Sequence, residues 1–316
     1  MTTAGSNFIS GITTTVFAST DVVNKDYVDA NVQPLPSQTG NAGKFLTTTD
    51  GTNISWDYVS NSQEFTVTGA QTFNVPSYSN LLFIEAVGAG GGGNAGTTGG
   101  NSGSGGGSGS YTSWYIPKSI VTSNITVNPG VGGTGGTTNA TTGSAGAGTT
   151  VSWTGPGGTY TITASGGGAA GVAGTAQAVS QSSFYYTTAG LGGASQTPVG
   201  SGFTATTQTN QFQPTAGGSG AGSTVSSGGS GGTINVYGIS TSASGGTSSG
   251  TNGSAGIAYT GLPYGSGGGG GGASVSIAAT GGNGARGGGG GGGASIGSTF
   301  GAGGNGGDGY VKITWW

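Results

Sequence analysis

The sequence predicts a mostly β protein, in which a short helix and a hairpin precede an antiparallel β-sandwich combined with a polyglycine-II helix bundle. Three observations lead to this class. Glycine supplies 79 of the 316 residues, whereas about 7% is usual. Several segments alternate apolar and polar residues with the period of two that is typical of strands. Charged residues make up only 4% of the chain, and residues 119–285 contain none.

The composition excludes many kinds of chemistry. The chain has no His and no Cys, so it lacks the groups that build Ser-His-Asp and Cys-His triads, ordinary zinc sites, haem ligation and iron–sulfur centres. Its net charge of −3 does not favour nucleic acid. No apolar run approaches the roughly 20 residues that span a bilayer. We therefore expect no enzymatic activity, no cofactor, no metal site, no nucleic acid and no membrane insertion.

A composition rich in Gly, Ser and Thr is also typical of disordered chains, which cannot bury enough apolar surface to offset the loss of conformational entropy. Here, however, 31% of the residues are hydrophobic, including 10 Phe, 12 Tyr and 5 Trp. We therefore expect an ordered chain. Most of the charged residues precede residue 65, which predicts an N-terminal region over 1–62 and a glycine-rich domain over 63–316.

In the N-terminal region, residues 20–29 predict a short helix with Val23, Tyr27 and Val28 on one face. A helix of about ten residues is not stable alone in water, so this apolar face requires a partner. The segments 44–47 and 53–56 flank Asp50-Gly51, a dipeptide that favours a hairpin turn.

A region of about 60 residues has little core of its own. We therefore expect the hairpin residues Phe45, Leu46 and Trp56 to be buried by self-association, together with the apolar face of the helix.

In the glycine-rich domain, short segments with strand periodicity are separated by turn residues, which favours an antiparallel sandwich. The predicted strands are 65–68, 81–87, 111–116, 124–127, 150–153, 160–163, 233–237 and 310–315. The sequence Gly155-Pro156-Gly157-Gly158 predicts a tight turn between two of them.

The glycine runs 267–272 and 287–293 require a different structure. Each glycine inside a helix or strand costs about 0.5–1 kcal/mol relative to Ala, and the Gly-X-Y period of collagen is absent. Polyproline-II geometry has three residues per turn and no internal hydrogen bonds, so side-chain-free helices can hydrogen-bond one another in a bundle. Flexible loops are the alternative interpretation.

Two N-terminal segments resemble known sequences. Residues 21–29, DVVNKDYVD, and residues 40–56, GNAGKFLTTTDGTNISW, resemble two elements of the trimeric fibre proteins of tailed bacteriophages; the second carries one additional Thr before Asp50. The domain from GAGGGG at 88–93 to GGNGGDGYVKI at 303–313 resembles the glycine-rich domain of phage tail fibres. The resemblance implies a homotrimer, with the helix and hairpin as trimerising elements.

The resemblance also implies a function. Glycine-rich adhesins of phage fibre tips use bundles of such helices as rigid supports and bind the host through the joining loops. The resemblance points to aromatic insertions between glycine runs as receptor contacts, because exposed aromatic rings supply contact area. The candidates are Phe184, Tyr185, Tyr186, Phe203, Phe212, Tyr259, Leu262 and Tyr264. The alternative is that these side chains fill the ends of the bundle or the trimer interface.

The isolated charges have structural and functional interpretations. Arg286 is expected to bind backbone carbonyls at an end of the bundle or to contact a ligand. Asp308 and Lys312 are expected to form an ion pair or to protect a sheet edge. The acidic residues are too few and too widely spaced for a glycosidase pair.

The sequence thus favours a virion protein, made in the host cytoplasm and incorporated as a tail fibre. Its N-terminal region would bind other tail or virion proteins, and its glycine-rich domain would bind a bacterial surface glycan or outer-membrane protein. Alternatives are a non-adhesive decoration of the head, collar or baseplate, an ice-binding protein and a polysaccharide depolymerase.

Overall fold

A computed structural model describes residues 44–48, 54–57, 60–169, 185–187, 208–209, 214–222, 225–236, 239–258 and 262–316. The chain forms two compact units, Met1–Asn61 and Ser62–Trp316. The predicted helix at 20–29, with Val23, Tyr27 and Val28, lies outside the described residues.

The first unit contains the predicted hairpin. Strands β1 (Phe45–Thr48) and β2 (Ile54–Asp57) pair antiparallel, with Phe45 opposite Asp57 and Leu46 opposite Trp56. Leu46 is 41% exposed and Trp56 is half-buried. Because directly opposed residues share a face of the hairpin, these two side chains form an apolar surface. The proposed use of this surface in a trimer stays a prediction.

The second unit contains two main antiparallel sheets, as the strand periodicity predicts. The larger sheet has the order β10-β6-β5-β16-β3. Its strands are β3 (Asn61–Phe65), β5 (Leu81–Val87), β6 (Tyr111–Pro117), β10 (Tyr185–Thr187) and β16 (Tyr310–Trp315). The smaller sheet, of order β4-β7-β8-β9, contains β4 (Gln71–Phe73), β7 (Ile125–Asn128), β8 (Thr149–Gly155) and β9 (Gly158–Ala164).

The described part of this unit also contains a short helix and two small sheets. A short 3₁₀ helix, η2 (Lys118–Ile120), follows β6. Strands β11 (Gln208–Thr209), β12 (Ile234–Val236) and β13 (Ile239–Thr241) form a small sheet in which β11 and β12 are parallel. Strands β14 (Ser295–Ile296) and β15 (Thr299–Phe300) form a short antiparallel hairpin with two residues in each strand.

The two main sheets share one hydrophobic core. Alternate residues of β5, Leu82 and Ile84, are fully buried, and they belong to the same cluster as Ile125 of β7, Val151 of β8 and Ile162 of β9. Burying each such side chain contributes about 1.5–3 kcal/mol. The apolar face of each sheet is therefore covered by the other sheet.

Two local predictions need correction. The first predicted strand, at 65–68, is wrong because β3 ends at Phe65. The chain then bends, with Gly69 at a φ of 98°, and enters the other sheet. Lys312 does not protect an edge, because β16 lies between β5 and β3. The predicted turn is confirmed: Gly155 pairs with Gly158 across Pro156 and Gly157.

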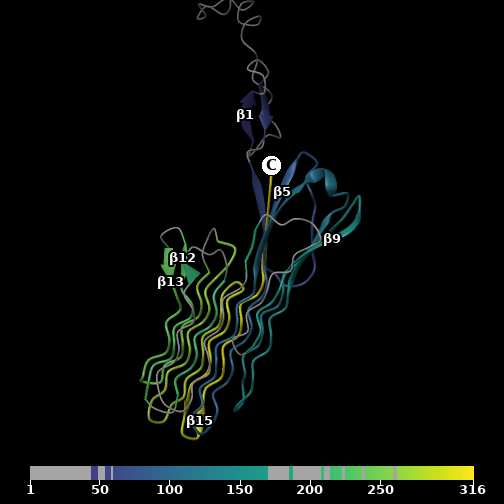
Figure 1. The fold of residues 1–316 in the computed structure, drawn as a ribbon. Coiled ribbons are helices and arrows are strands. Elements are labelled where there is room, and N and C mark those ends of the chain that lie inside the picture. The colour runs from purple at the N-terminus through teal and green to yellow at the C-terminus, as the bar shows by residue number, and fades with distance from the viewer. Residues whose placement is uncertain are drawn as a thin grey trace, which may run out of the picture. The chain divides into compact units, whose positions relative to one another are not determined.

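Extended glycine-rich tracts make up much of the remainder of the second unit (Figure 1). They run side by side from the end of the sheets near β5 toward the loop that carries β15. We call these segments the tracts: 88–96, 103–110, 130–136, 141–148, 165–168, 215–221, 226–232, 243–247, 251–258, 265–273, 279–285, 287–295 and 301–309.

The hydrogen bonds of tract 88–96 repeat every three residues. Successive N–H groups donate to tracts 103–110, 141–148 and 301–309 in turn, and every residue from Gly88 to Gly96 follows this order at N···O distances of 2.8–3.1 Å. An extended strand would alternate between two sides. The repeat of three therefore distinguishes tract 88–96 from an extended β-strand.

The carbonyl groups of tract 88–96 face other neighbours. They accept N–H groups from the segment 133–140, from tract 165–168 and from tract 287–295. Tract 88–96 is thus hydrogen-bonded on six sides. The same order of three holds in Gly289–Ser295, whose N–H groups donate in turn to tracts 215–221, 88–96 and 279–285.

The close approach of the tracts explains their composition. A Cβ atom on Gly290 would lie less than 3.0 Å from the carbonyl group of Gly304, and one on Gly92 would lie equally close to the carbonyl of Thr134. Real Cβ atoms essentially never approach a neighbour so closely. Backbone hydrogen bonds between tracts therefore do the packing that side chains do in the sheets.

The Thr215 side chain takes the place of one backbone hydrogen bond in the repeat. Tract 265–273 donates from Ala273 to Ser226 and from Gly270 to Gly229, so the next bond in this series would join Gly267 to Gly232. Instead, the Thr215 hydroxyl accepts from the Gly267 N–H at 3.1 Å and donates to the Gly232 carbonyl at 2.6 Å.

We expect Thr215→Val to destabilise the second unit by about 1–3 kcal/mol, because the change is nearly isosteric but leaves a buried donor and acceptor without partners. Thr215 is fully buried, so water cannot replace the hydroxyl without rearrangement. Urea denaturation of the full chain measures the effect. Thr215→Ser, which retains the hydroxyl, is the matched control, and equal loss in both variants would contradict the bridging role.

Candidate functional site: a junction of charged and aromatic side chains

The strongest gathering of charged and aromatic groups among the described residues lies where the larger sheet meets the tracts. Strands β3, β5, β6 and β16 contribute side chains from the sheet, and the segment 262–264 and Arg286, which adjoin the ends of tracts, contribute the others. We call this cluster the junction: Glu64, Glu85, Tyr111, Leu262, Tyr264, Arg286 and Tyr310.

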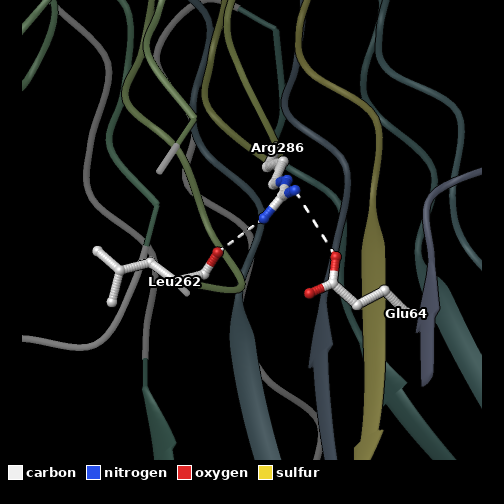
Figure 2. Close-up of polar contacts among 3 residues, drawn as sticks. All are labelled: Glu64, Leu262 and Arg286. Carbon is white, nitrogen blue, oxygen red and sulfur yellow. Dashed lines mark hydrogen bonds and ion pairs between the residues drawn. The ribbon is translucent and has the colours of Figure 1, made fainter. Parts of the chain in front are cut away.

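Arg286 connects three segments of the junction (Figure 2). Its Nη1 donates to the Leu262 carbonyl at 2.8 Å, and its Nη2 lies 3.9 Å from Oε2 of Glu64. The guanidinium carbon also lies 4.6 Å from the centre of the Tyr310 ring, a cation–π contact. The prediction that Arg286 binds a backbone carbonyl at an end of the tracts is confirmed.

Arg286 occupies an unusual backbone position between tracts 279–285 and 287–295. Its φ is 21°, and the following Gly287 has a φ of 78°. Positive φ values cost energy in residues other than glycine. The contacts of the Arg286 side chain offset this cost and fix the turn.

A second group of contacts surrounds Tyr111. Its hydroxyl donates to Oε1 of Glu85 at 2.9 Å, and its ring packs edge-to-face on Tyr264 at 5.8 Å between centroids. Both rings lie in a buried cluster with Val87, Ile234 and Tyr310. The segment before tract 265–273 is thus packed directly on the sheet.

Burial at the junction shifts several pKa values. Desolvation raises the pKa of Glu85, although the hydrogen bond from Tyr111 and the charge of Lys312 oppose this shift. Burial, together with the charge of Glu85, raises the pKa of Tyr111. Burial and the neighbouring Glu64 raise the pKa of Tyr310. The site thus keeps both phenols protonated.

The raised phenol pKa values predict loss of stability at high pH. Above the ordinary tyrosine pKa of 10.0, the unfolded chain releases protons that Tyr111 and Tyr310 retain when folded, so rising pH favours unfolding. Thermal midpoints measured between about pH 8 and pH 11 should fall progressively above about pH 10. The double variant Tyr111→Phe/Tyr310→Phe should show a shallower fall, and an identical slope would contradict the assignment.

The structure changes the interpretation of the receptor-contact candidates. Tyr185 and Tyr186 lie in strand β10, opposite Ser113 and Thr112 of β6, and not in a loop between tracts. Tyrosine favours strands, and β6 would otherwise be an edge. Tyr264 is fully buried, and its ring packs on Tyr111 of the larger sheet.

Leu262 is partly buried against the Tyr264 cluster. Leu262 and Tyr264 therefore agree with the alternative interpretation, in which these side chains fill the end of the bundle. Phe184, Phe203, Phe212 and Tyr259 lie outside the described residues.

Sequence reasoning missed the partners of Arg286 and Tyr111. Glu64, Glu85 and Tyr310 come from strands separated widely along the chain, and no short motif links them. The alternation of residues in β5 was a usable signal, because it places Glu85 on the face opposite to Leu82 and Ile84. A carboxylate in such an apolar strand indicates a partner on that face.

The described residues contain no group of three or more acidic side chains arranged to hold a metal ion. Within the same ranges, no helix has the length and apolar character required to cross a bilayer. The contacts of Arg286 with Glu64 and Tyr310, and the ring contact of Tyr111 with Tyr264, hold the tracts to the larger sheet.

This architecture defines a class of glycine-rich proteins in which hydrogen-bonded tracts extend from a β core. The family model for a glycine-rich domain matches residues 65–316, so the chain belongs to this glycine-rich domain family. No curated protein matches the sequence.

Proposed function

We propose that the protein is a structural fibre protein of a tailed bacteriophage, which attaches the virion to its host through the glycine-rich domain. The N-terminal region would trimerise and bind the particle. The basis is the pair of N-terminal elements at 21–29 and 40–56, which resemble those of trimeric phage fibres. The observation that supports a rigid glycine-rich domain is the repeat of three in the tract hydrogen bonds.

We further propose that the tracts form a polyglycine-II bundle. A threefold order of donors is the pattern expected of a helix with three residues per turn. At a rise of about 3.1 Å per residue, the tract 265–273 would span roughly 28 Å. A bundle with hydrogen bonds on six sides would hold the loops at its far end in fixed positions, which reduces the entropy lost when a receptor is bound.

Trimerisation would strengthen weak contacts. Three domains on one fibre engage a surface together, so the second and third contacts form at high effective concentration. Among the described residues of the second unit, the charged side chains lie in the sheets, in η2 or at the ends of tracts next to the junction. The described loops at the far end of the tracts would therefore act through uncharged groups.

Adsorption competition tests the proposal. Purified full chain, incubated with the host cells of the phage that carries it, should reduce phage adsorption in proportion to its concentration. Antibodies against the glycine-rich domain should label the distal ends of tail fibres in electron micrographs. Labelling of the head, collar or baseplate, without competition, would establish the non-adhesive decoration instead.

The oligomeric state is a separate test. Light scattering of the purified full chain should give the mass of three chains. A monomer at micromolar concentration would contradict the trimeric fibre.

A further inference from the structure

Three Asn–Gly dipeptides occur in the whole sequence, at Asn252-Gly253, Asn283-Gly284 and Asn305-Gly306. All three lie in tracts, and all three asparagines are exposed to solvent. Asn–Gly is chemically labile, because the glycine has no side chain to keep its nitrogen away from the asparagine side chain. Burial does not separate these asparagines from water, so another feature must control their reactivity.

Each dipeptide forms two hydrogen bonds with a neighbouring tract, one through the asparagine Oδ1 and one through the glycine N–H. Oδ1 of Asn252 accepts the Thr280 N–H at 3.0 Å, and the Gly253 N–H donates to the Thr280 carbonyl at 3.0 Å. Asn283 and Gly284 bind the N–H and carbonyl of Asn305 in the same way, at 2.9 and 2.8 Å.

The third dipeptide, Asn305-Gly306, does the same across two residues of tract 130–136. Oδ1 of Asn305 accepts the Gly135 N–H, and the Gly306 N–H donates to the Gly133 carbonyl, both at 2.8 Å. In all three cases, the adjacent tract binds both groups that would react with each other. These groups are the asparagine side chain and the backbone nitrogen of the following glycine.

We propose that Asn252, Asn283 and Asn305 are latent deamidation sites that pairing between tracts holds unreactive. When a tract opens, the glycine nitrogen loses its proton and bonds to Cγ of the asparagine, and the side-chain nitrogen leaves as ammonia. Water then opens the succinimide ring at either carbonyl and yields aspartate or isoaspartate. No electrons are transferred, and water is the only co-reactant.

The two products differ in their effect on the tracts. Aspartate retains the acceptor oxygen, and Asp308 already accepts the Gly132 N–H at 2.8 Å from a position three residues after Asn305. Isoaspartate adds a methylene group to the backbone. This insertion breaks the order of three, because the hydrogen bonds beyond it fall out of register with the adjacent tract. An opened tract that forms isoaspartate therefore cannot pair again.

Peptide mapping by mass spectrometry tests the protection. The full chain is incubated at about pH 8, either folded or in urea, and conversion is followed at each asparagine. Unfolding should accelerate conversion at Asn252, Asn283 and Asn305 by at least about tenfold. Asn94 and Asn139 are matched controls, because they lie in or beside tracts but precede alanine, and they should convert more slowly in urea. Equal rates in folded and unfolded chains would overturn the proposal.

Refolding tests the consequence. After incubation in urea, the chain is refolded and the native fraction is isolated by size exclusion. Molecules with isoaspartate at the three sites should be depleted from this fraction, whereas those with aspartate should remain. The variant Asn305→Asp should retain the thermal midpoint of the unmodified chain. Recovery of isoaspartate-containing molecules in full, or failure of Asn305→Asp to fold, would contradict the mechanism.

Discussion

The variant Gly290→Ala is expected to lose at least about 3 kcal/mol of stability, the scale of severe overpacking. Gly290 lies in the centre of tract 287–295, which has neighbours on all sides. A Cβ atom here would lie less than 3.0 Å from the Gly304 carbonyl, which accepts the Gly93 N–H at 2.9 Å. The carbonyl cannot move away without breaking that bond, so one methyl group disturbs three tracts.

Thermal unfolding of the full chain measures this effect. A loss of about 3 kcal/mol lowers the midpoint by roughly 6–12 °C in a domain of this size. Gly148→Ala is the matched control, because a Cβ atom there would lie 3.4 Å from the nearest atom, an ordinary contact, on an exposed residue. If the two variants had similar midpoints, the tight contact between tracts would not be a determinant of stability.

Only part of this fold could be predicted from the sequence. The strands of the two main sheets follow from alternation, and 81–87 and 310–315 coincide with β5 and β16. The absence of side chains in 267–272 and 287–293 indicated close backbone approach, but sequence alone does not specify which tracts are neighbours. That information resides in hydrogen bonds between residues far apart along the chain.

The candidate site was less predictable for a related reason. Aromatic residues in a glycine-rich chain serve equally well as exposed contacts and as packing groups, and sequence does not distinguish the two. Tyr264 is followed by the tract 265–273, which begins on the sheet, so its ring faces Tyr111 and not solvent. For Tyr264, the position of the tract start on the sheet thus decides the role of the aromatic residue.

The dipeptides Asn–Gly and Asp308-Gly309 are a signal that could have been used. In several tracts, Asn and Asp side chains accept N–H groups from adjacent tracts, as Asn305 does from Gly135 and Asp308 from Gly132. A short polar side chain followed by glycine thus predicts an acceptor for an N–H group of an adjacent tract.

Arg286→Met is expected to destabilise the second unit by about 2–4 kcal/mol. The hydrogen bond from Nη1 to the Leu262 carbonyl is charge-assisted, and such bonds contribute about 1.5–3 kcal/mol. The cation–π contact with Tyr310 adds about 0.5–1 kcal/mol. Methionine retains much of the apolar stem, so the loss measures the guanidinium contacts and not the packing. Urea denaturation of the full chain gives the free energy.

The ion pair with Glu64 should contribute little to this effect. Its N···O distance is 3.9 Å, and the Glu64 side chain is 45% exposed, so water screens the charges and leaves less than about 1 kcal/mol. A double-mutant cycle of Arg286→Met and Glu64→Gln isolates this term. A coupling energy above that of Arg286 with Tyr310→Leu would show that the charge pair contributes more than the ring contact.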